Sequence, residues 1–245
     1  MKRVNLDNTT LEHFRILVHS VRAGGKTHLA GDFLNYEKQF GDVAFLSIEG
    51  EGLMTIKGIG LGNVGYVIET LKDLKELTAE FAKKPLQAIA LDSLQVLERI
   101  IKLHVVGTLD KSPSSTKETN QWVDLQREFE NILLGLGRSA KFIMCTCPSA
   151  INADNITNNP RLISPDLTGQ RALGCAGYFE YVGYIKTMQT GKGVSKRSIQ
   201  FASDGVTLVR QQTPNEIIED IQLPQGAGGW LVIKQRIEKG LINGT

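Results

Sequence analysis

Residues 16–30, ILVHSVRAGGKTHLA, decide the fold of this chain. They combine a short apolar run, a loop with two glycines, then Lys26 and Thr27, and finally residues that can start a helix. This is the pattern of a P-loop, in which backbone N–H groups and a helix N-terminus surround phosphate oxygens while a lysine adds a positive charge. The stretch therefore predicts a phosphate-binding turn between a buried strand and a helix.

One position of this loop departs from the usual pattern, Gly-x-x-x-x-Gly-Lys-[Ser/Thr]. Gly25, Lys26 and Thr27 match its last three positions, but Ser20 stands where the first glycine belongs. Glycine adopts positive φ at little cost, so a serine there must hold an ordinary dihedral or carry strain. A chance Gly-Gly-Lys-Thr in a strand-to-helix turn is the alternative. We expect the nucleotide contacts to come from Ser20, Val21, Arg22, Ala23, Gly24, Gly25, Lys26, Thr27 and His28.

Length and composition favour one α/β domain. With 245 residues, 41% of them hydrophobic, the chain can bury a full core, and we expect a domain over residues 1–210 and a C-terminal tail over 211–245. The 28 basic and 26 acidic residues give a net charge of +2, so contact with nucleic acid requires a local basic patch. Three cysteines are too few for a disulfide framework, and we find no signal segment and no apolar run of the roughly 18 residues that span a bilayer. These features predict a cytoplasmic protein without a membrane partner.

A second buried strand is expected within residues 42–51, DVAFLSIEGE, and it ends at Glu49. In open α/β sheets, ligands bind beyond the carboxyl ends of the strands, so Glu49 would face the same crevice as the P-loop. We interpret Glu49 as the group that orients and deprotonates an attacking water. The alternative is a solvated turn residue.

A third apolar run, LQAIAL over residues 86–91, closes on Asp92. A carboxylate at this position of a P-loop fold holds, often through water, the Mg²⁺ that bridges the terminal phosphates. We therefore expect Thr27 and Asp92 to place Mg²⁺, while Lys26 neutralises charge on the phosphates of ATP.

The remaining pattern completes an α/β chain whose sheet turns antiparallel late. Helices are expected over residues 67–81, 94–105 and 122–136, and a strand over residues 141–146. Residues 107–120 form a polar break, and residues 149–174 the longest loop of the chain. Further strands, in hairpin arrangement, are expected over residues 178–188, 197–201 and 206–209.

The order of these motifs resembles the RecA-like P-loop NTPase core: a P-loop, then a strand ending in Glu (FLSIEGE), then a strand ending in Asp-Ser (IALDS). More narrowly, ALDSLQVLERI, QWVDLQREFENILLGL, KFIMCTCPS, PDLTGQRAL and YFEYVGYIKT resemble phage-encoded, AAA-type RecA-like nucleotide-binding proteins, some of which are single-strand annealing recombinases. The similarity covers roughly residues 14 to 210. It implies an α/β fold with a mostly parallel sheet and a late antiparallel hairpin.

The resemblance also implies a function: Mg²⁺-dependent ATP hydrolysis coupled to single-stranded DNA binding, in homo-oligomeric rings or filaments within a host cell. A single-strand-binding protein is then a candidate partner. The position of the family's γ-phosphate sensor falls on Cys147, and a thiol is a poor hydrogen-bond donor. Coupling to the following loop is therefore weak or runs through Thr146.

Basic residues suggest where DNA binds. The resemblance assigns the breaks at residues 107–120 and 148–175 to DNA-facing loops. A local patch of four basic residues without an intervening acid is formed by Lys186, Lys192, Lys196 and Arg197. A solvated turn is the alternative. Arg171 or Lys186 could also reach a neighbouring subunit's γ-phosphate as a trans-acting finger, which requires an oligomer.

Two functions follow from the sequence. The first is an ATP-dependent recombination or annealing protein that binds single-stranded DNA, an ATPase supported by Glu49. The second is a nucleotide-gated binding or assembly protein with little hydrolysis, which the departures at Ser20 and Cys147 favour.

Overall fold

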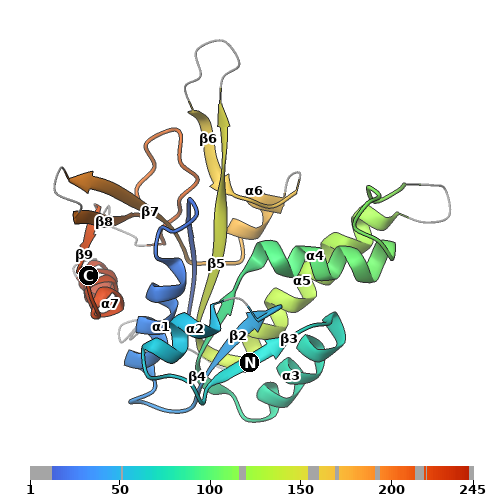
Figure 1. The fold of residues 1–245 in the computed structure, drawn as a ribbon, viewed down its shortest axis with the longest axis horizontal. Coiled ribbons are helices and arrows are strands. Elements are labelled where there is room, and N and C mark those ends of the chain that lie inside the picture. The colour runs from blue at the N-terminus through green and yellow to red at the C-terminus, as the bar shows by residue number, and fades with distance from the viewer. Residues whose placement is uncertain are drawn as a thin grey trace.

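A computed structural model describes residues 13–50, 52–115, 120–153, 160–168, 171–190, 194–212, 218 and 220–242. Within these residues the chain forms a nine-stranded sheet with helices on both faces (Figure 1). The strands are β1 (Phe14–Ser20), β2 (Val43–Ile48), β3 (Gly65–Ile68), β4 (Leu86–Asp92), β5 (Ala140–Ala153), β6 (Pro160–Pro165), β7 (Tyr181–Thr190), β8 (Val194–Gln200) and β9 (Ile221–Leu223). The helices are α1 (Lys26–Glu37), α2 (Leu53–Gly58), α3 (Leu71–Lys83), α4 (Leu94–Val106), α5 (Gln121–Ser139), α6 (Arg171–Ala176) and α7 (Gly229–Ile242).

The sheet order is β3-β2-β4-β5-β1-β7-β8-β9, with β6 paired to β5 outside this path. Strands β1 to β5 and β7 pair in parallel, whereas β8 and β9 add antiparallel at one end. The P-loop strand β1 and the Asp92 strand β4 are therefore separated by β5. The predicted fold class, α/β with a mostly parallel sheet and a late antiparallel hairpin, is confirmed by this topology.

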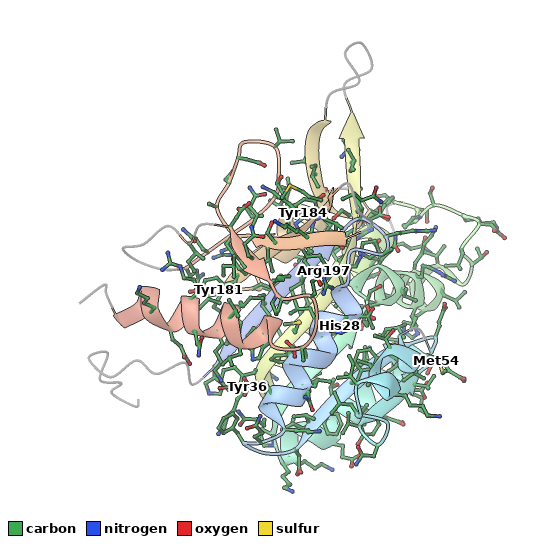
Figure 2. All side chains as sticks on the ribbon, turned by 60° about the vertical axis from the view of Figure 1, so that its left-hand side comes forward. His28, Tyr36, Met54, Tyr181, Tyr184 and Arg197 are labelled. Atoms are coloured by element: carbon green, nitrogen blue, oxygen red, sulfur yellow. The ribbon has the colours of Figure 1, made fainter. Side chains whose placement is uncertain are left out.

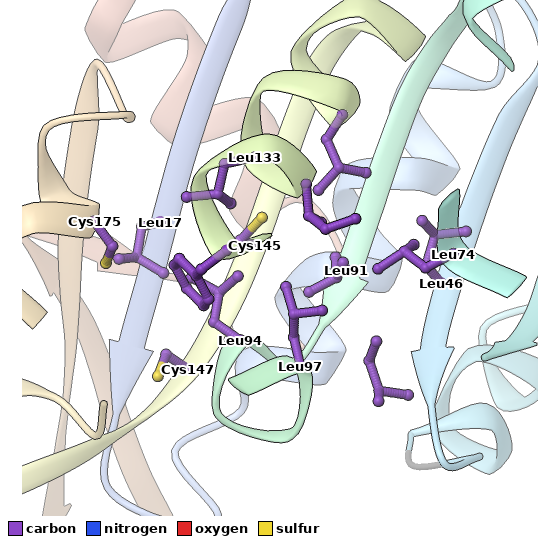
Figure 3. Close-up of a cluster of buried hydrophobic side chains, with 14 of the residues drawn as sticks. Leu17, Leu46, Leu74, Leu91, Leu94, Leu97, Leu133, Cys145, Cys147 and Cys175 are labelled. Atoms are coloured by element: carbon purple, nitrogen blue, oxygen red, sulfur yellow. The ribbon is translucent and has the colours of Figure 1, made fainter. Parts of the chain in front are cut away.

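The central strands are apolar on both faces because helices cover both. In β4, Ile89 and Leu91 point into the core formed with α3, α4 and α5, whereas Ala88 and Ala90 point into the core formed with α1 and α7. Strand residues alternate between faces, so a parallel strand buried on both sides reads as a continuous apolar run. Figure 3 shows the first of these cores, where Leu91 and Cys145 from the sheet meet Leu97 and Leu133 from the helices.

Two sequence predictions about local structure were wrong. Residues 149–174 are not one loop, because β5 continues to Ala153 and pairs antiparallel with β6, and α6 follows. The helix expected from residue 67 begins at Leu71, because β3 occupies the preceding residues. Its start has a recognisable signal: the Thr70 side chain accepts from the Asp73 N–H, and the Asp73 carboxylate accepts from the Thr70 N–H, which is a capping box.

The strand expected over residues 206–209 is also absent as a regular element. This segment makes isolated bridges instead, with Thr207 beside Ile163 and Arg210 beside Val182. It therefore connects the β6 hairpin to β7 rather than extending the late hairpin.

The described residues beyond 210 pack against the rest of the chain, where the sequence predicted a C-terminal tail over residues 211–245. Strand β9 pairs with β8, and α7 packs on α1 with Trp230, Ile233 and Ile237 buried. The carboxylate of Asp32 in α1 accepts from the backbone N–H of Gly228 (2.8 Å) and of Trp230 (2.7 Å). These bonds satisfy N–H groups at the start of α7 that would otherwise lack partners.

A second anchor lies one turn further along α1. The buried carboxylate of Glu37 accepts from Trp230 Nε1 and Lys234 Nζ, both at 2.9 Å, and from Gln87 Nε2 at 2.9 Å. A buried charge is tolerated only when it is paired and hydrogen-bonded, so α7 and α1 depend on each other. Within the described residues, no helix combines the length and apolar composition needed to cross a bilayer.

We expect Trp230→Ala to destabilise the domain by about 3–5 kcal/mol, because it removes a buried aromatic side chain and one hydrogen bond to Glu37. Val232→Ala is the matched control, since Val232 lies on the same helix and is 38% exposed. Urea unfolding of the whole chain measures both. Equal, small effects would mean that α7 does not stabilise this fold.

Candidate functional site

The P-loop connects β1 to α1 through a turn with two left-handed residues. Ala23 has φ of 60° and Gly25 has φ of 87°, and the Gly24 N–H donates to the Val21 carbonyl at 3.2 Å. Gly25 is the N-cap of α1, and no side chain caps this helix end. The first N–H groups of α1 are therefore oriented toward the loop, as anion binding requires.

The serine at position 20 is accommodated by a glycine four residues later. Ser20 is fully buried and its hydroxyl donates to the Val21 carbonyl at 2.8 Å. A Cβ placed on Gly24 would lie 2.2 Å from Ser20 Oγ, so the serine side chain takes the space beside Gly24. The positive φ values of the loop fall on Ala23 and Gly25 rather than on Ser20, which resolves the departure without strain at that position.

Lys26 is held over the loop. Its ammonium donates to Ser20 O (3.1 Å), Ser20 Oγ (3.0 Å) and Val21 O (3.3 Å). Partial burial lowers the pKa of Lys26, and the negative charge of Asp92 opposes this shift. The cation and the loop therefore form one region of positive potential.

Thr27 and Asp92, the two residues expected to place Mg²⁺, are in direct contact. Thr27 Oγ1 donates to Asp92 Oδ2 at 2.7 Å, and Thr146 Oγ1 on β5 donates to the other oxygen, Oδ1. Asp92 is only 6% exposed. Mg²⁺ typically uses one or two carboxylates or hydroxyls of the protein together with water and phosphate oxygens, and this pair fits that requirement. The described residues contain no cluster of three or more His, Cys, Asp or Glu for a metal, so bound Mg²⁺ would depend on these oxygens and on its ligand.

Gly52 lies directly against Thr27 and Asp92. It was not identified from the sequence as part of the site. A Cβ on Gly52 would lie 2.8 Å from Asp92 Oδ2 and 2.8 Å from Thr27 Cγ2, and its φ is 77°. Both the space and the backbone conformation favour glycine. The glycines that follow Glu49 in the sequence were a signal for this close approach.

Glu49 directly follows the last residue of β2. Among the described residues, no hydrogen bond or ion pair joins its carboxylate to Thr27 or Asp92. It adopts a left-handed φ of 56°, and its carboxylate pairs with Arg99 of α4 at 3.5 Å. The side chain is 42% exposed. Arg99 was also missed, because nothing in its helical spacing signals a partner 50 residues earlier. The role of Glu49 as a general base stays a prediction.

The histidine preceding Ser20 fixes the end of β1. His19 is buried, with Nε2 at 2.8 Å from the Leu208 carbonyl and Nδ1 at 2.9 Å from Ser149 Oγ. A carbonyl only accepts, so Nε2 carries the proton and Nδ1 accepts from the hydroxyl. Burial lowers the pKa of His19 to about 4, the bond to Leu208 opposes the shift, and the charge of Lys26 adds to it.

The strand β5 presents Thr146, not Cys147, to the site. Cys147 is buried, and burial raises the pKa of its thiol well above the ordinary value. Burial also raises the pKa of Cys175, to about 12, and that of Cys145. These thiols therefore stay protonated and pack in the core.

Arg171 does not occupy the position of a trans-acting finger. Its side chain is 6% exposed and its guanidinium donates to Glu98 Oε1. The same carboxylate accepts from the Thr168 N–H at 3.0 Å and from Thr168 Oγ1 at 3.0 Å, and Arg171 also lies over the Trp122 ring. In this structure Arg171 ties α6 to α4, so the prediction of a role in a neighbouring site is corrected.

The predicted basic patch is not one surface. Thr187 is opposite Arg197 and Met188 is opposite Lys196, so strand alternation directs Arg197 to the face opposite that of Lys186 and Lys196. Lys186 pairs with Asp220 at 3.1 Å, whereas Lys196 is exposed. Lys192 lies outside the described residues. Arg197 contacts the P-loop instead, which corrects its assignment to a DNA surface shared with the lysines.

Comparisons with known proteins add little to this geometry. No protein-family model matches the chain, and no curated protein matches it. Among solved structures, the crystal structure of the flagellar accessory protein FlaH from Methanocaldococcus jannaschii is similar, with a TM-score of 0.49 and 15% sequence identity. The match covers 86% of this chain and 84% of that chain. Similarity at this level carries no argument about function.

We expect the stability of the domain to fall as pH falls from about 6.5 toward 4 through His19. In this range the unfolded histidine, with a pKa of 6.5, binds a proton that the folded one, with a pKa of about 4, does not. Stability therefore rises with pH across the window, by roughly 3 kcal/mol for this group.

Urea unfolding at several pH values, compared between the wild type and His19→Gln, measures this contribution, since other groups titrate in both proteins. The glutamine variant should show a shallower dependence on pH. Parallel curves would show that His19 is not buried in its neutral form.

Proposed function

We propose that this chain binds ATP with Mg²⁺ at the P-loop and hydrolyses it. The observation that carries the proposal is the 2.7 Å hydrogen bond from Thr27 Oγ1 to Asp92 Oδ2, next to the ammonium of Lys26. It joins a hydroxyl of the first turn of α1 to a carboxylate at the end of β4, the pair of oxygens that holds Mg²⁺ in P-loop NTPases. The resemblance of the motif order to the RecA-like core supports the same reaction.

Each residue then has a defined task. Lys26 exchanges its bonds to Ser20 and Val21 for phosphate oxygens and offsets their charge. Thr27 and Asp92 hold Mg²⁺, which supplies charge neutralisation on the terminal phosphates when bound. Glu49 orients a water and accepts its proton, and for this its carboxylate must leave Arg99. That half-exposed pair is weak, so its loss costs little.

We further propose that nucleotide turnover is coupled to single-stranded DNA in recombination or annealing, in a homo-oligomeric ring or filament, with a single-strand-binding protein as candidate partner. A cavity of about 350 Å³ lined by Arg99, Lys102 and Trp122 supports this. It borders the polar break after α4 that the resemblance assigns to DNA. Exposed aromatic rings and cations together bind the bases and phosphates of single strands.

The second function, a nucleotide-gated assembly protein with little hydrolysis, is favoured by two observations. The carboxylate of Glu49 is paired with Arg99, and the thiol at the sensor position is buried and protonated. If that arrangement persists with ATP bound, nucleotide sets the oligomeric state and is turned over slowly.

ATP turnover by the purified protein, with and without single-stranded DNA, tests the first function. We expect DNA to raise turnover. Lys26→Ala should abolish ATP binding, because it removes the cation of the loop, whereas Glu49→Gln should keep binding and lower the turnover rate by about 10²–10⁴-fold. Lys38→Ala, an exposed lysine at the end of α1, is the control for Lys26→Ala.

ATP binding through Lys26 with negligible, DNA-independent turnover would overturn the hydrolysis proposal. An ATP-dependent change of oligomeric state in the same preparation would then establish the second function.

Trp122→Ala should weaken single-stranded DNA binding by roughly 1–3 kcal/mol for each base that stacks on the ring, with ATP affinity unchanged. Leu134→Ala, at another exposed apolar position of α5, is the control. Fluorescence anisotropy of a labelled oligonucleotide at several salt concentrations measures the affinity and counts phosphate contacts. Unchanged DNA affinity in the tryptophan variant would exclude this cavity as the DNA site.

A further inference from the structure

Arg197 of β8 lies across the P-loop. A Cβ placed on Gly25 would be 2.3 Å from Arg197 Nη1, 3.5 Å from Cζ and 3.6 Å from Cδ, so the side chain covers the glycine that precedes Lys26. Figure 2 shows Arg197 at the end of α1 that carries His28. The guanidinium therefore lies beside the first turn of α1.

The sheet holds Arg197 in this position. It is paired with Thr187 on one side and with Leu223 of β9 on the other, and its Nη2 donates to the Pro224 carbonyl at 3.3 Å. The segment that follows Pro224 is fixed to α1 through Asp32, which accepts from the Gly228 and Trp230 N–H groups. The arginine and the loop it covers are thus anchored to the same helix.

Positive charges meet at this contact, and a bound anion would offset them. The amino end of α1 carries positive potential, and Lys26 adds a full charge. A guanidinium placed at a helix N-terminus is unfavourable by itself, since cations are stabilised at the opposite end. Among the described residues no carboxylate lies within ion-pair distance of Arg197, and its acceptor is a neutral carbonyl.

We propose that Arg197 is a cis-acting phosphate ligand of the nucleotide site and recognises the polyphosphate chain rather than DNA. This rests on the proposed function, because the ligand is the nucleotide bound at the P-loop. A guanidinium presents a fork of N–H donors that matches phosphate oxygens, and charge-assisted bonds of this kind are among the strongest in proteins. The site then obtains its second side-chain cation from its own chain and does not require a neighbouring subunit for it.

Equilibrium binding of fluorescent ATP, with inorganic tripolyphosphate as competitor, tests this assignment. Arg197→Gln removes the charge and shortens the side chain, so it also loses the bond from Nη2 to the Pro224 carbonyl. We expect it to weaken both ATP and tripolyphosphate by about tenfold or more, and Arg197→Lys to have a smaller effect. Lys196→Ala, the neighbouring residue on the opposite face of β8, should bind as the wild type does.

Thermal unfolding without nucleotide separates a binding defect from misfolding, and the Arg197→Gln variant should unfold near the wild-type temperature. Loss of ATP binding in Lys26→Ala with wild-type affinity in Arg197→Gln would overturn the role of Arg197 and leave the proposed function intact. A wild-type protein that binds no nucleotide would overturn the proposed function itself. Weakened single-stranded DNA binding with unchanged ATP binding would return Arg197 to a DNA surface.

Discussion

The hydrogen bond between Thr27 and Asp92 is the contact on which the site depends. It joins the start of α1 to the end of β4 across the sheet, although β5 lies between β1 and β4. The intervening strand takes part, because Thr146 binds the second oxygen of the same carboxylate. Three elements thereby fix one buried charge, and a buried carboxylate with both oxygens satisfied holds a single orientation. The loop after β2 can approach this pair only because Gly52 has no side chain.

Helix α1 connects this site to the C-terminal part of the chain. Its first turn forms the P-loop, its middle receives the N–H groups that start α7, and its last turn holds the buried Glu37. The β8–β9 pair brings Arg197 back to the first turn. The proposed phosphate site and the contacts that hold α7 therefore lie on the same helix.

The features that could be predicted from the sequence are those set by local residue patterns. The P-loop, the Asp92 strand and the parallel core follow from apolar runs and from residues whose chemistry is position-specific, and these agree with the structure. The positions of Arg171 and Arg197 could not be predicted in the same way. Arg171 is buried because Glu98, 73 residues earlier, faces it, and Arg197 faces the P-loop because of its register with β7. A shift of one residue in that register would reverse its face, and no local pattern sets it. The start of α3 was predictable, since Thr70 and Asp73 form a capping box.

The contact between Ser20 and Gly24 bears on how this loop can change over evolution. In the usual pattern a glycine occupies position 20, and here the serine hydroxyl fills the volume that a Cβ at position 24 would need. The two positions thus compete for the same space within one turn. In related sequences a side chain at position 20 should coincide with glycine at position 24, whereas glycine at position 20 would leave a Cβ at position 24 in close contact with the Val21 carbonyl oxygen, at 3.1 Å. The departure at Ser20 is then a matter of packing within the turn, and the positive φ values of the loop stay at Ala23 and Gly25.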